Sequence, residues 1–382
     1  MTEAARHINR WWLASLLLVM LTSCAGGDAS DGTTTEPQPD PVLTFYVYAP
    51  ERPMITRAAD DVNAVSAEEY AIYSLQIWVF ETNTNNLVGY LKPSVYPTDG
   101  TGTMYQMTVS KAFANAVTKP HVDVYVIANS ATIGLSALGK NTSRDDLEEA
   151  VIGSESFGVG APVSNIVDKG LPMSGVLRDQ SIIGSNPVLT IGEGSTMAKV
   201  RLLRTVSKMR YVFSRKIGTT DVYITGIAID GNMIPVQEYV FLTDRSYRIG
   251  SSYEPLTATL HKKTTEVKTS ADPDAYLYTD QSSQEYETLI DEGVASDKLT
   301  QMGPFYFKET DKKISGTITY RVGSSNAQTV PFYMTVDDVD KRFVRNHSWI
   351  VYGYFNGAAE KPIITVWVDT NWQTGDYFTI EN

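Results

Sequence analysis

The stretch Ile72-Tyr-Ser-Leu-Gln-Ile-Trp-Val-Phe80 predicts a β-strand, because apolar, aromatic and β-branched residues dominate it. It is followed by Thr82-Asn-Thr-Asn-Asn86, a run of turn-forming residues. A second strand of the same kind is predicted at His121-Val-Asp-Val-Tyr-Val-Ile-Ala-Asn129. These two apolar stretches favour β-structure as the framework of the first half of the chain.

Strand patterns recur in the rest of the chain. Leu43, Phe45 and Val47 alternate with Thr44, Tyr46 and Tyr48, which is the two-residue period of a strand. Further strands are predicted at residues 209–213, 222–229, 316–320, 331–336, 349–355 and 363–368. A helix is expected to begin at Ser143, whose hydroxyl suits an N-cap before an acidic first turn. Many short strands with almost no helix indicate an all-β fold made of sandwiches.

The first 24 residues have the pattern of a lipoprotein signal peptide. Two arginines precede an apolar run at residues 11–20, and Leu21-Thr-Ser-Cys24 follows. The run is shorter than the roughly 20 residues that a membrane-spanning helix needs. Cys24 is the only cysteine, so it forms no intrachain disulfide, and its position makes it the candidate for a thioether-linked lipid. The alternative is an ordinary signal peptide that ends near a cysteine.

The sequence after Cys24 indicates where the lipid would hold the chain. Ala25, rather than an aspartate, follows the cysteine, which favours transport to the outer membrane. Residues 24–41 are rich in Gly, Ser, Thr, Asp and Pro and predict a disordered tether. We therefore expect an exported chain that is attached to the outer membrane through Cys24.

Composition and motifs argue against several other functions. The net charge of −12 argues against a nucleic-acid partner, because phosphate binding needs a basic surface. The four histidines lack metal-ligand spacing, and no cofactor or metal is expected. Asp337-Asp-Val-Asp340 lacks the spacing of a calcium loop and is expected to be a solvated turn. No phosphate loop or nucleophile elbow is visible, so no catalytic residue is assigned and no enzyme is expected, although distant paired carboxylates would leave no local signature.

Length predicts two domains. More than 300 residues remain after the signal peptide at 1–23 and the tether at 24–41, which is the usual size of two domains. We expect an N-terminal β-sandwich at residues 42–195 and a C-terminal β-sandwich at residues 196–382.

Six segments, taken in order along the chain, form a pattern that is similar to one known family. They are Arg57-Ala58, Val124-Tyr-Val-Ile-Ala-Asn129, Leu171-Pro-Met-Ser-Gly175, Leu203-Arg-Thr-Val-Ser-Lys208, Phe343-Val-Arg-Asn-His-Ser-Trp349 and Asp369-Thr-Asn-Trp372. Together they resemble the fimbrillin family, the major subunits of lipoprotein-derived (type V) pili. The family often has a proline before its C-terminal tryptophan, and this chain lacks it before Trp372.

The resemblance implies a fold, a processing step and a mode of assembly. It implies two transthyretin-like β-sandwich domains and cleavage by an Arg-specific surface protease. Cleavage removes the first strand, and a strand from another pilin subunit fills the groove that is left. Main-chain hydrogen bonds then give affinity, and alternate side-chain pockets give register. Head-to-tail contacts of this kind grow into open filaments, which support adhesion.

Residues 42–48 are the candidate removable strand, with Leu43, Phe45 and Val47 on one face. The cleavage loop is expected at residues 49–61, with the cut between Arg57 and Ala58. Arg52 is the competing site, but the following proline constrains the backbone and lacks an N–H, and most proteases reject it. The alternative is an uncut loop.

The candidate donor strand is the tail at residues 375–382. Phe378 and Ile380 share one face at strand spacing, whereas Tyr377 and Thr379 take the other. The alternative is that the tail completes the sheet of its own C-terminal domain.

These expectations favour a polymerising stalk subunit whose partners are other subunits, the protease and the outer membrane. Two further functions stay open. An anchor or tip subunit of the same pilus would keep its lipid or lack a donor tail. A glycan-binding surface lipoprotein would use some of the 22 tyrosines, and a glycan array would identify it.

Overall fold

The fold is all-β, and the computed structural model describes most of the chain between residues 39 and 368. The described residues are 39–50, 67–98, 100–153, 157, 161–162, 165–242, 267–272, 300–336, 339–340, 343–357 and 361–368. Cys24, Arg57, Ala58 and the tail with Tyr377, Phe378 and Ile380 lie outside them. No described helix is both long and apolar enough to cross a membrane.

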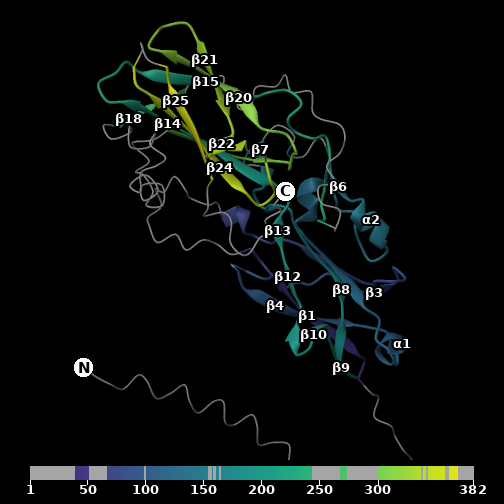
Figure 1. Ribbon diagram of the computed structural model, residues 1–382. Helices are drawn as coiled ribbons and strands as arrows, with labels where there is room; N and C mark the ends of the chain where they lie inside the picture. Colours follow the sequence, from purple (N-terminus) through teal and green to yellow (C-terminus); the bar gives the residue numbers. More distant parts are fainter. Residues whose placement is uncertain are drawn as a thin grey trace, which may run out of the picture. The chain divides into compact units, whose positions relative to one another are not determined.

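Two sheets form the first half of the described structure (Figure 1). The first sheet has the order β11-β10-β1-β12, with β4 paired to β1 and β9 paired to β10. The second has the order β13-β8-β5-β2-β3. The strands are β1 (Val42–Tyr48), β2 (Leu75–Glu81), β3 (Leu87–Leu91), β4 (Gly102–Thr108), β5 (Val122–Ala128), β8 (Met173–Gln180), β9 (Ile182–Ser185), β10 (Val188–Glu193), β11 (Thr196–Met197), β12 (Lys199–Arg201) and β13 (Leu203–Arg204).

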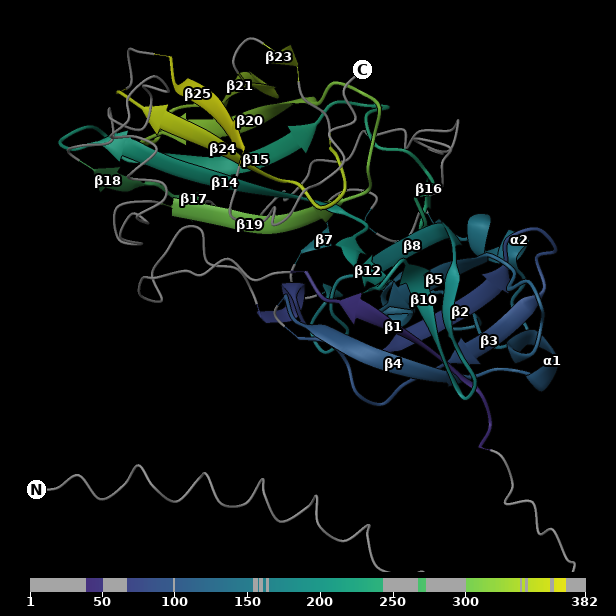
Figure 2. The ribbon, with the colours of Figure 1, turned by 60° about the horizontal axis from the view of Figure 1, so that its bottom comes forward.

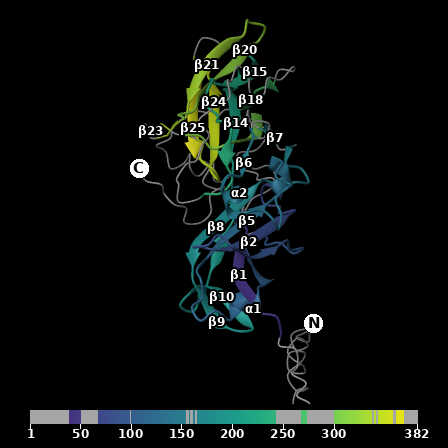
Figure 3. The same ribbon diagram turned by 90° about the vertical axis from the view of Figure 1, so that its right-hand side faces the viewer.

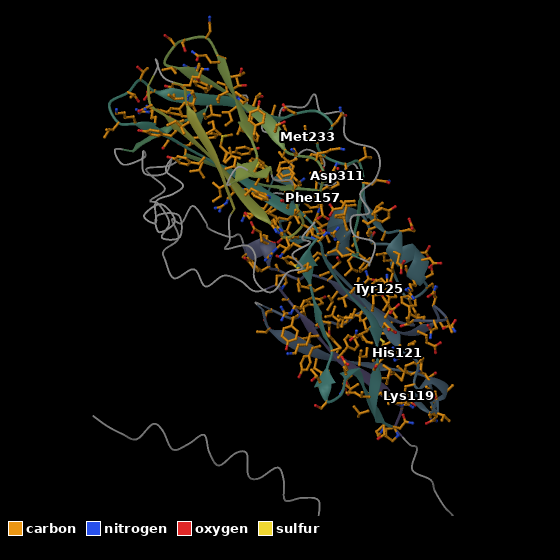
Figure 4. All side chains as sticks on the ribbon, viewed as in Figure 1. Lys119, His121, Tyr125, Phe157, Met233 and Asp311 are labelled. Atoms are coloured by element: carbon orange, nitrogen blue, oxygen red, sulfur yellow. The ribbon has the colours of Figure 1, made fainter. Side chains whose placement is uncertain are left out.

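The two strands that the sequence predicted most strongly, β2 and β5, lie next to each other in the second sheet. Every residue of β5 is buried, as are the first six of β2, so apolar residues run continuously instead of alternating. The indole of Trp78 donates to the carbonyl of Gly139, at 2.9 Å, in the connection after β5. Figure 4 shows side chains filling this part of the structure, with Tyr125 labelled on β5.

The helices among the described residues are few and short, and the two α-helices each begin after a serine whose hydroxyl caps them. The helix predicted at Ser143 is confirmed as α2 (Arg144–Glu148). Its capping box joins the Ser143 hydroxyl to the Asp146 amide and the Asp146 carboxylate to the Ser143 amide. The other helical segments are α1 (Lys111–Ala114), η1 (Ala67–Glu69) and η2 (Ser130–Ile133).

A second pair of sheets forms most of the remainder. One sheet has the order β25-β24-β14-β19-β7, with β18 paired to β14, and the other has the order β17-β15-β20-β21. Figure 3 shows β25, β24 and β14 in succession. The strands are β7 (Ala161–Pro162), β14 (Ser207–Lys216), β15 (Val222–Ile229), β17 (Val267–Lys268), β18 (Ser270–Asp272), β19 (Thr300–Phe307), β20 (Ser315–Val322), β21 (Gln328–Tyr333), β24 (Ser348–Phe355) and β25 (Ile363–Val368).

Each pair of sheets encloses its own apolar core. Aromatic rings fill the second core. The ring centroids of Tyr211 and Phe332 are 6.0 Å apart, and the ring of Phe307 stacks on that of Phe343 with centroids 4.4 Å apart. Short strands cross between the two halves of the sequence. β6 (Val151–Ile152) pairs with β16 (Glu238–Tyr239), and β7 pairs with β19. A last small pair joins β22 (Thr335–Val336) to β23 (Val339–Asp340).

The first pair of sheets continues past residue 195, where the sequence suggested a domain boundary. Gly194 and Ser195 form the turn of the hairpin between β10 and β11, and Gly194 has a φ of 59°. β12 then pairs with β1, and β13 pairs with β8. The glycine-rich stretch is therefore a turn within a sheet, and the change from one pair of sheets to the other comes after Arg204.

Candidate functional site

Strand β1, the candidate removable strand, lies inside a sheet rather than at its edge. All seven of its residues pair antiparallel with β4. Its other side pairs parallel with β10 through residues 42–44 and with β12 through residues 46–48. Figure 2 shows β1, in purple, beside β4 and close to β10. We call the position between β4 and β10/β12 the β1 slot.

The inward face of β1 carries the three residues that the sequence singled out. Leu43, Phe45 and Val47 are fully buried and belong to the first core. Burial of each side chain stabilises the fold by roughly 1.5–3 kcal/mol. The alternation predicted for these residues is therefore found, and it places the three side chains as successive apolar knobs in the slot.

On the inward side of the slot, β4 places apolar and aromatic side chains opposite β1. Met107 lies opposite Leu43, and Tyr105 lies opposite Phe45 with ring centroids 6.4 Å apart. The Tyr105 hydroxyl donates to the carbonyl of Val95 at 2.7 Å. Burial raises the pKa of Tyr105 to about 12, against a smaller lowering from its hydrogen bond with Thr103, so this hydroxyl stays a donor at neutral pH. A strand that replaced β1 would meet the same side chains of β4.

Both ends of β1 lead into stretches outside the described residues. Residues 1–38 precede it, and residues 51–66, which contain Arg57 and Ala58, follow it. A cut anywhere within 51–66 would leave β1 and everything before it without a covalent bond to the rest of the chain. The structure thus shows what such a cut would detach, whereas Arg57, Ala58 and Cys24 themselves stay predictions.

The segment directly after residues 51–66 is held by side chains far away in sequence. We call residues 67–73 the anchor segment. Asn129 accepts from the Tyr73 amide and donates to the carbonyls of Ala71 and Leu171, each at 2.8 Å. Asn129 has a φ of 56°, in the left-handed region that asparagine tolerates. Gly170 packs so closely here that an added Cβ would lie 2.4 Å from the Ala71 carbonyl oxygen.

Glu69 of the anchor segment lies in a buried polar cluster. Its Oε1 lies 2.9 Å from Lys208 Nζ and accepts from the Tyr306 hydroxyl at 2.7 Å. Arg204 Nε donates to the Glu69 carbonyl at 3.0 Å, and its Nη1 donates to Asn346 Oδ1 at the same distance. All five residues are essentially inaccessible to solvent. We call them the Glu69 cluster.

The charges and hydrogen bonds of this cluster are complementary. Burial raises the pKa of Tyr306 well above its usual value, and the neighbouring carboxylate of Glu69 adds to the shift, so the tyrosine is a donor. The guanidinium of Arg204 also lies 4.3 Å from the ring centroid of Tyr70. Buried charges of this kind are tolerated only when they are paired and hydrogen-bonded.

A second buried cluster is built on Arg345. Its Nε donates to Glu309 Oε2 and its Nη2 to Glu238 Oε1, both at 3.0 Å. The same guanidinium donates to the carbonyls of Val240 and Tyr239. Burial raises the pKa of Glu238 to about 8, against the attraction of Arg345, and the nearby Glu309 raises it further.

A third, partly exposed cluster covers one end of β5. Glu148 lies 3.0 Å from Arg144 Nε and 2.8 Å from Arg178 Nη2, and it accepts from the Tyr125 hydroxyl at 2.7 Å. Burial disfavours the charge of Glu148, but the hydrogen bonds from these three neighbours outweigh it and lower its pKa to about 2. This cluster touches none of the anchor segment among the printed contacts of the described residues, so it offers a control for the Glu69 cluster.

Other chemistry is sparse in the part of the chain that the structure describes. No group of three or more His, Cys, Asp or Glu side chains there is arranged to hold a metal ion. His121, which directly precedes β5, lies 2.7 Å from the Asp179 carboxylate at the surface. His347 Nδ1 lies 2.9 Å from the carbonyl of Arg345. Both histidines thus have structural partners.

Sequence reasoning quoted Asn129, Arg204, Arg345 and Asn346 within family-like segments but gave them no role. The structure brings Arg204 and Asn346 together, and Asn129 joins the anchor segment to Leu171. Glu69 was missed altogether. The available signal was weak, because charged or amide residues next to apolar runs do not reveal partners that lie between 36 and 237 residues away.

Comparison with solved structures identifies the fold class. A proposed cell adhesion protein from Bacteroides eggerthii matches with a TM-score of 0.50 and 13% identity, over 87% of this chain and 96% of that chain. The two chains share an all-β fold. The tip fimbrial protein Mfa3 from Porphyromonas gingivalis, with a C-terminal truncation, matches with a TM-score of 0.45 and 13% identity, over 86% of this chain and 99% of that chain.

A family model matches part of the sequence. Residues 53–205 match the family model of the major fimbrial subunit protein (FimA), which confirms the resemblance to the fimbrillin family over that part of the chain. No protein of curated function matches the sequence. The family match therefore relates residues 53–205 to a fimbrial subunit.

Proposed function

We propose that this protein is a fimbrial subunit that polymerises when a strand of a neighbouring subunit replaces β1. The observation that carries the proposal is the position of β1. It is paired along both sides, its three inward side chains are fully buried, and only residues 51–66 join it to the later chain. The family match, which begins at residue 53 after β1, supports the same division.

Proteolysis gives the exchange its direction. While β1 is covalently attached, its effective concentration at the slot is on the order of millimolar, and a strand from another molecule cannot compete. Cleavage after Arg57 removes this advantage and also removes Cys24, so one cut frees the subunit from its lipid and makes the slot available. The Arg-specific protease and the outer membrane are therefore partners before assembly, and other subunits are partners afterwards.

The sheet order supports two β-sandwich domains that divide after Arg204, later than residue 195. The family match supports the same division, because it ends at residue 205. In this arrangement the slot belongs to the N-terminal domain, and the candidate donor strand follows β25 of the C-terminal domain. Each subunit then carries an acceptor and a donor, as a head-to-tail polymer requires.

Replacing Cys24 by serine is expected to abolish membrane attachment, because serine offers no thiol for the thioether to lipid. The measurement is detergent-phase partition together with metabolic lipid labelling of Cys24→Ser and of the unaltered chain. The unaltered chain should carry label and enter the detergent phase, whereas the variant should do neither. Label that survives in the variant would show that the lipid is not on Cys24.

Truncation after Trp372 is expected to give a protein that folds and is trimmed but stays monomeric. The reason is that Phe378 and Ile380 would no longer be available to fill a neighbour's slot. Each apolar side chain that enters the slot contributes roughly 1.5–3 kcal/mol. Size-exclusion chromatography of the trimmed protein measures the outcome.

Two further variants identify what the tail does. Phe378→Asp should reproduce the monomer, whereas Thr379→Asp, on the opposite face, should assemble. If truncation destroys the folded monomer, the tail is a strand of its own domain. A tip or anchor subunit is then the better interpretation.

A further inference from the structure

We propose that the Glu69 cluster is a clamp that keeps the anchor segment in place once the loop before it has been cut. This inference rests on the proposed cut within residues 51–66. It assigns to Glu69, Lys208 and Tyr306 a role in the trimmed subunit that neither the slot nor the donor strand supplies. These three are positioning residues, because they hold the anchor segment and lie outside the strands that border the β1 slot.

The need for a clamp follows from the chain order. The anchor segment lies between residues 51–66 and β2, so before the cut it is restrained on both sides by chain that enters a sheet. After the cut its N-terminal side is free. Its own regular structure is one 3₁₀ turn of three residues, η1, and a turn this short does not hold by itself.

The cluster is built to supply the missing restraint. Lys208 lies in β14 and Tyr306 lies in β19, so both partners of the Glu69 carboxylate belong to strands of the second pair of sheets. Arg204 adds a bond to the main chain of Glu69 and a contact with the ring of Tyr70. Glu69 thus ties the segment near the cut to a rigid sheet that trimming leaves untouched.

Loss of the clamp would affect the pair of sheets that contains the β1 slot. Tyr70 belongs to the first core. The side chain of Asn129, the residue after β5, accepts a hydrogen bond from the Tyr73 amide and donates one to the Ala71 carbonyl. If the anchor segment detached, these buried groups would be exposed at the end of the second sheet. The clamp therefore keeps the trimmed subunit folded during the interval before a donor strand arrives.

The test compares cut and uncut protein, with the cut made at an introduced protease site. In the full chain, residues 54–60 are replaced by the recognition sequence of a site-specific protease, so the native processing site plays no part. Hydrogen exchange of the peptide that covers residues 67–73 is then measured by mass spectrometry before and after the cut. The variants are Glu69→Gln, which keeps shape and removes the charge, and the milder Tyr306→Phe.

Both variants are expected to accelerate exchange of this peptide more strongly in the cut chain than in the uncut chain. For Glu69→Gln the additional acceleration on cutting should be about tenfold or more, as expected for loss of hydrogen bonds to a charged group. Tyr306→Phe should act in the same direction and more weakly. Glu148→Gln is the matched control, because it breaks an ion-pair cluster of the same half away from the anchor segment. It should show no dependence on the cut.

An equal acceleration in cut and uncut chains would overturn the clamp and leave the cluster as ordinary packing. So would an absence of acceleration in both variants. If Glu69→Gln does not fold, the comparison with Tyr306→Phe decides. Because the cut is imposed, these results are independent of the proposed function, which fails separately if native surface material does not begin at Ala58.

Discussion

Arg57→Ala is expected to block assembly completely while leaving the folded monomer intact. Without the cut, β1 stays covalently attached and keeps the slot, where its three inward side chains are fully buried. A donor strand would have to displace it against an effective concentration on the order of millimolar. Polymer formation on the cell surface, followed by gel electrophoresis of unheated samples, measures the result.

Arg52→Ala is the matched control for this substitution. It removes an arginine from the same loop, but Pro53 follows Arg52, and this bond is a poor protease substrate. The control is expected to be trimmed and to assemble like the unaltered chain. Normal assembly of Arg57→Ala, or a block caused by Arg52→Ala, would show that the cut has been assigned to the wrong residue.

Arg345→Met is expected to cause the largest loss of stability, about 3–5 kcal/mol at pH 9, because it leaves the buried acids Glu238 and Glu309 without their cation. Arg345 donates to both Glu238 and Glu309, and all three side chains are buried. Urea unfolding at pH 9 measures the loss. Arg321→Met, which removes an arginine that lies 4.0 Å from the ring centroid of Tyr223, is the control and should cost about 1 kcal/mol or less.

The stability that Arg345→Met loses is also expected to depend on pH. Folding raises the pKa of Glu238 from 4.5 to about 8. Between about pH 4.5 and pH 8, Glu238 therefore keeps its proton in the folded chain and has lost it in the unfolded chain. The free energy of unfolding that this group contributes falls as the pH rises through this range. At pH 5 Glu238 is neutral in the folded chain with or without Arg345, whereas above pH 8 its charge in the intact chain depends on Arg345, so Arg345→Met should cost less at pH 5 than at pH 9. An equal cost at both values would contradict this account of the cluster.

Local sequence patterns predicted the strands well where alternation or a bounded apolar run specified them. β1, β15 and β25 have the predicted bounds. β2 begins at Leu75 rather than at residue 72, because Asn129 takes the amide of Tyr73 in place of a neighbouring strand. Residues 194 and 195 lie in the hairpin turn between β10 and β11, and because a hairpin turn and a linker share the same small residues, the sequence alone does not distinguish them.

The candidate site was predictable only in part. Alternation gave the inward residues of β1, but its place inside the sheet depends on parallel pairing with β10 and β12, which begin more than 130 residues later. The Glu69 cluster escaped prediction for the same reason. Glu69, Lys208 and Tyr306 come from three distant stretches, and no short-range pattern marks a charge that only the folded chain buries.

The N-terminal residue of subunits purified from assembled surface fimbriae tests the central claim most directly. The account predicts a start at Ala58, with Cys24 and the whole of β1 absent from every assembled subunit. A start at Cys24, with β1 retained, would contradict replacement of β1 and favour a lipid-held anchor.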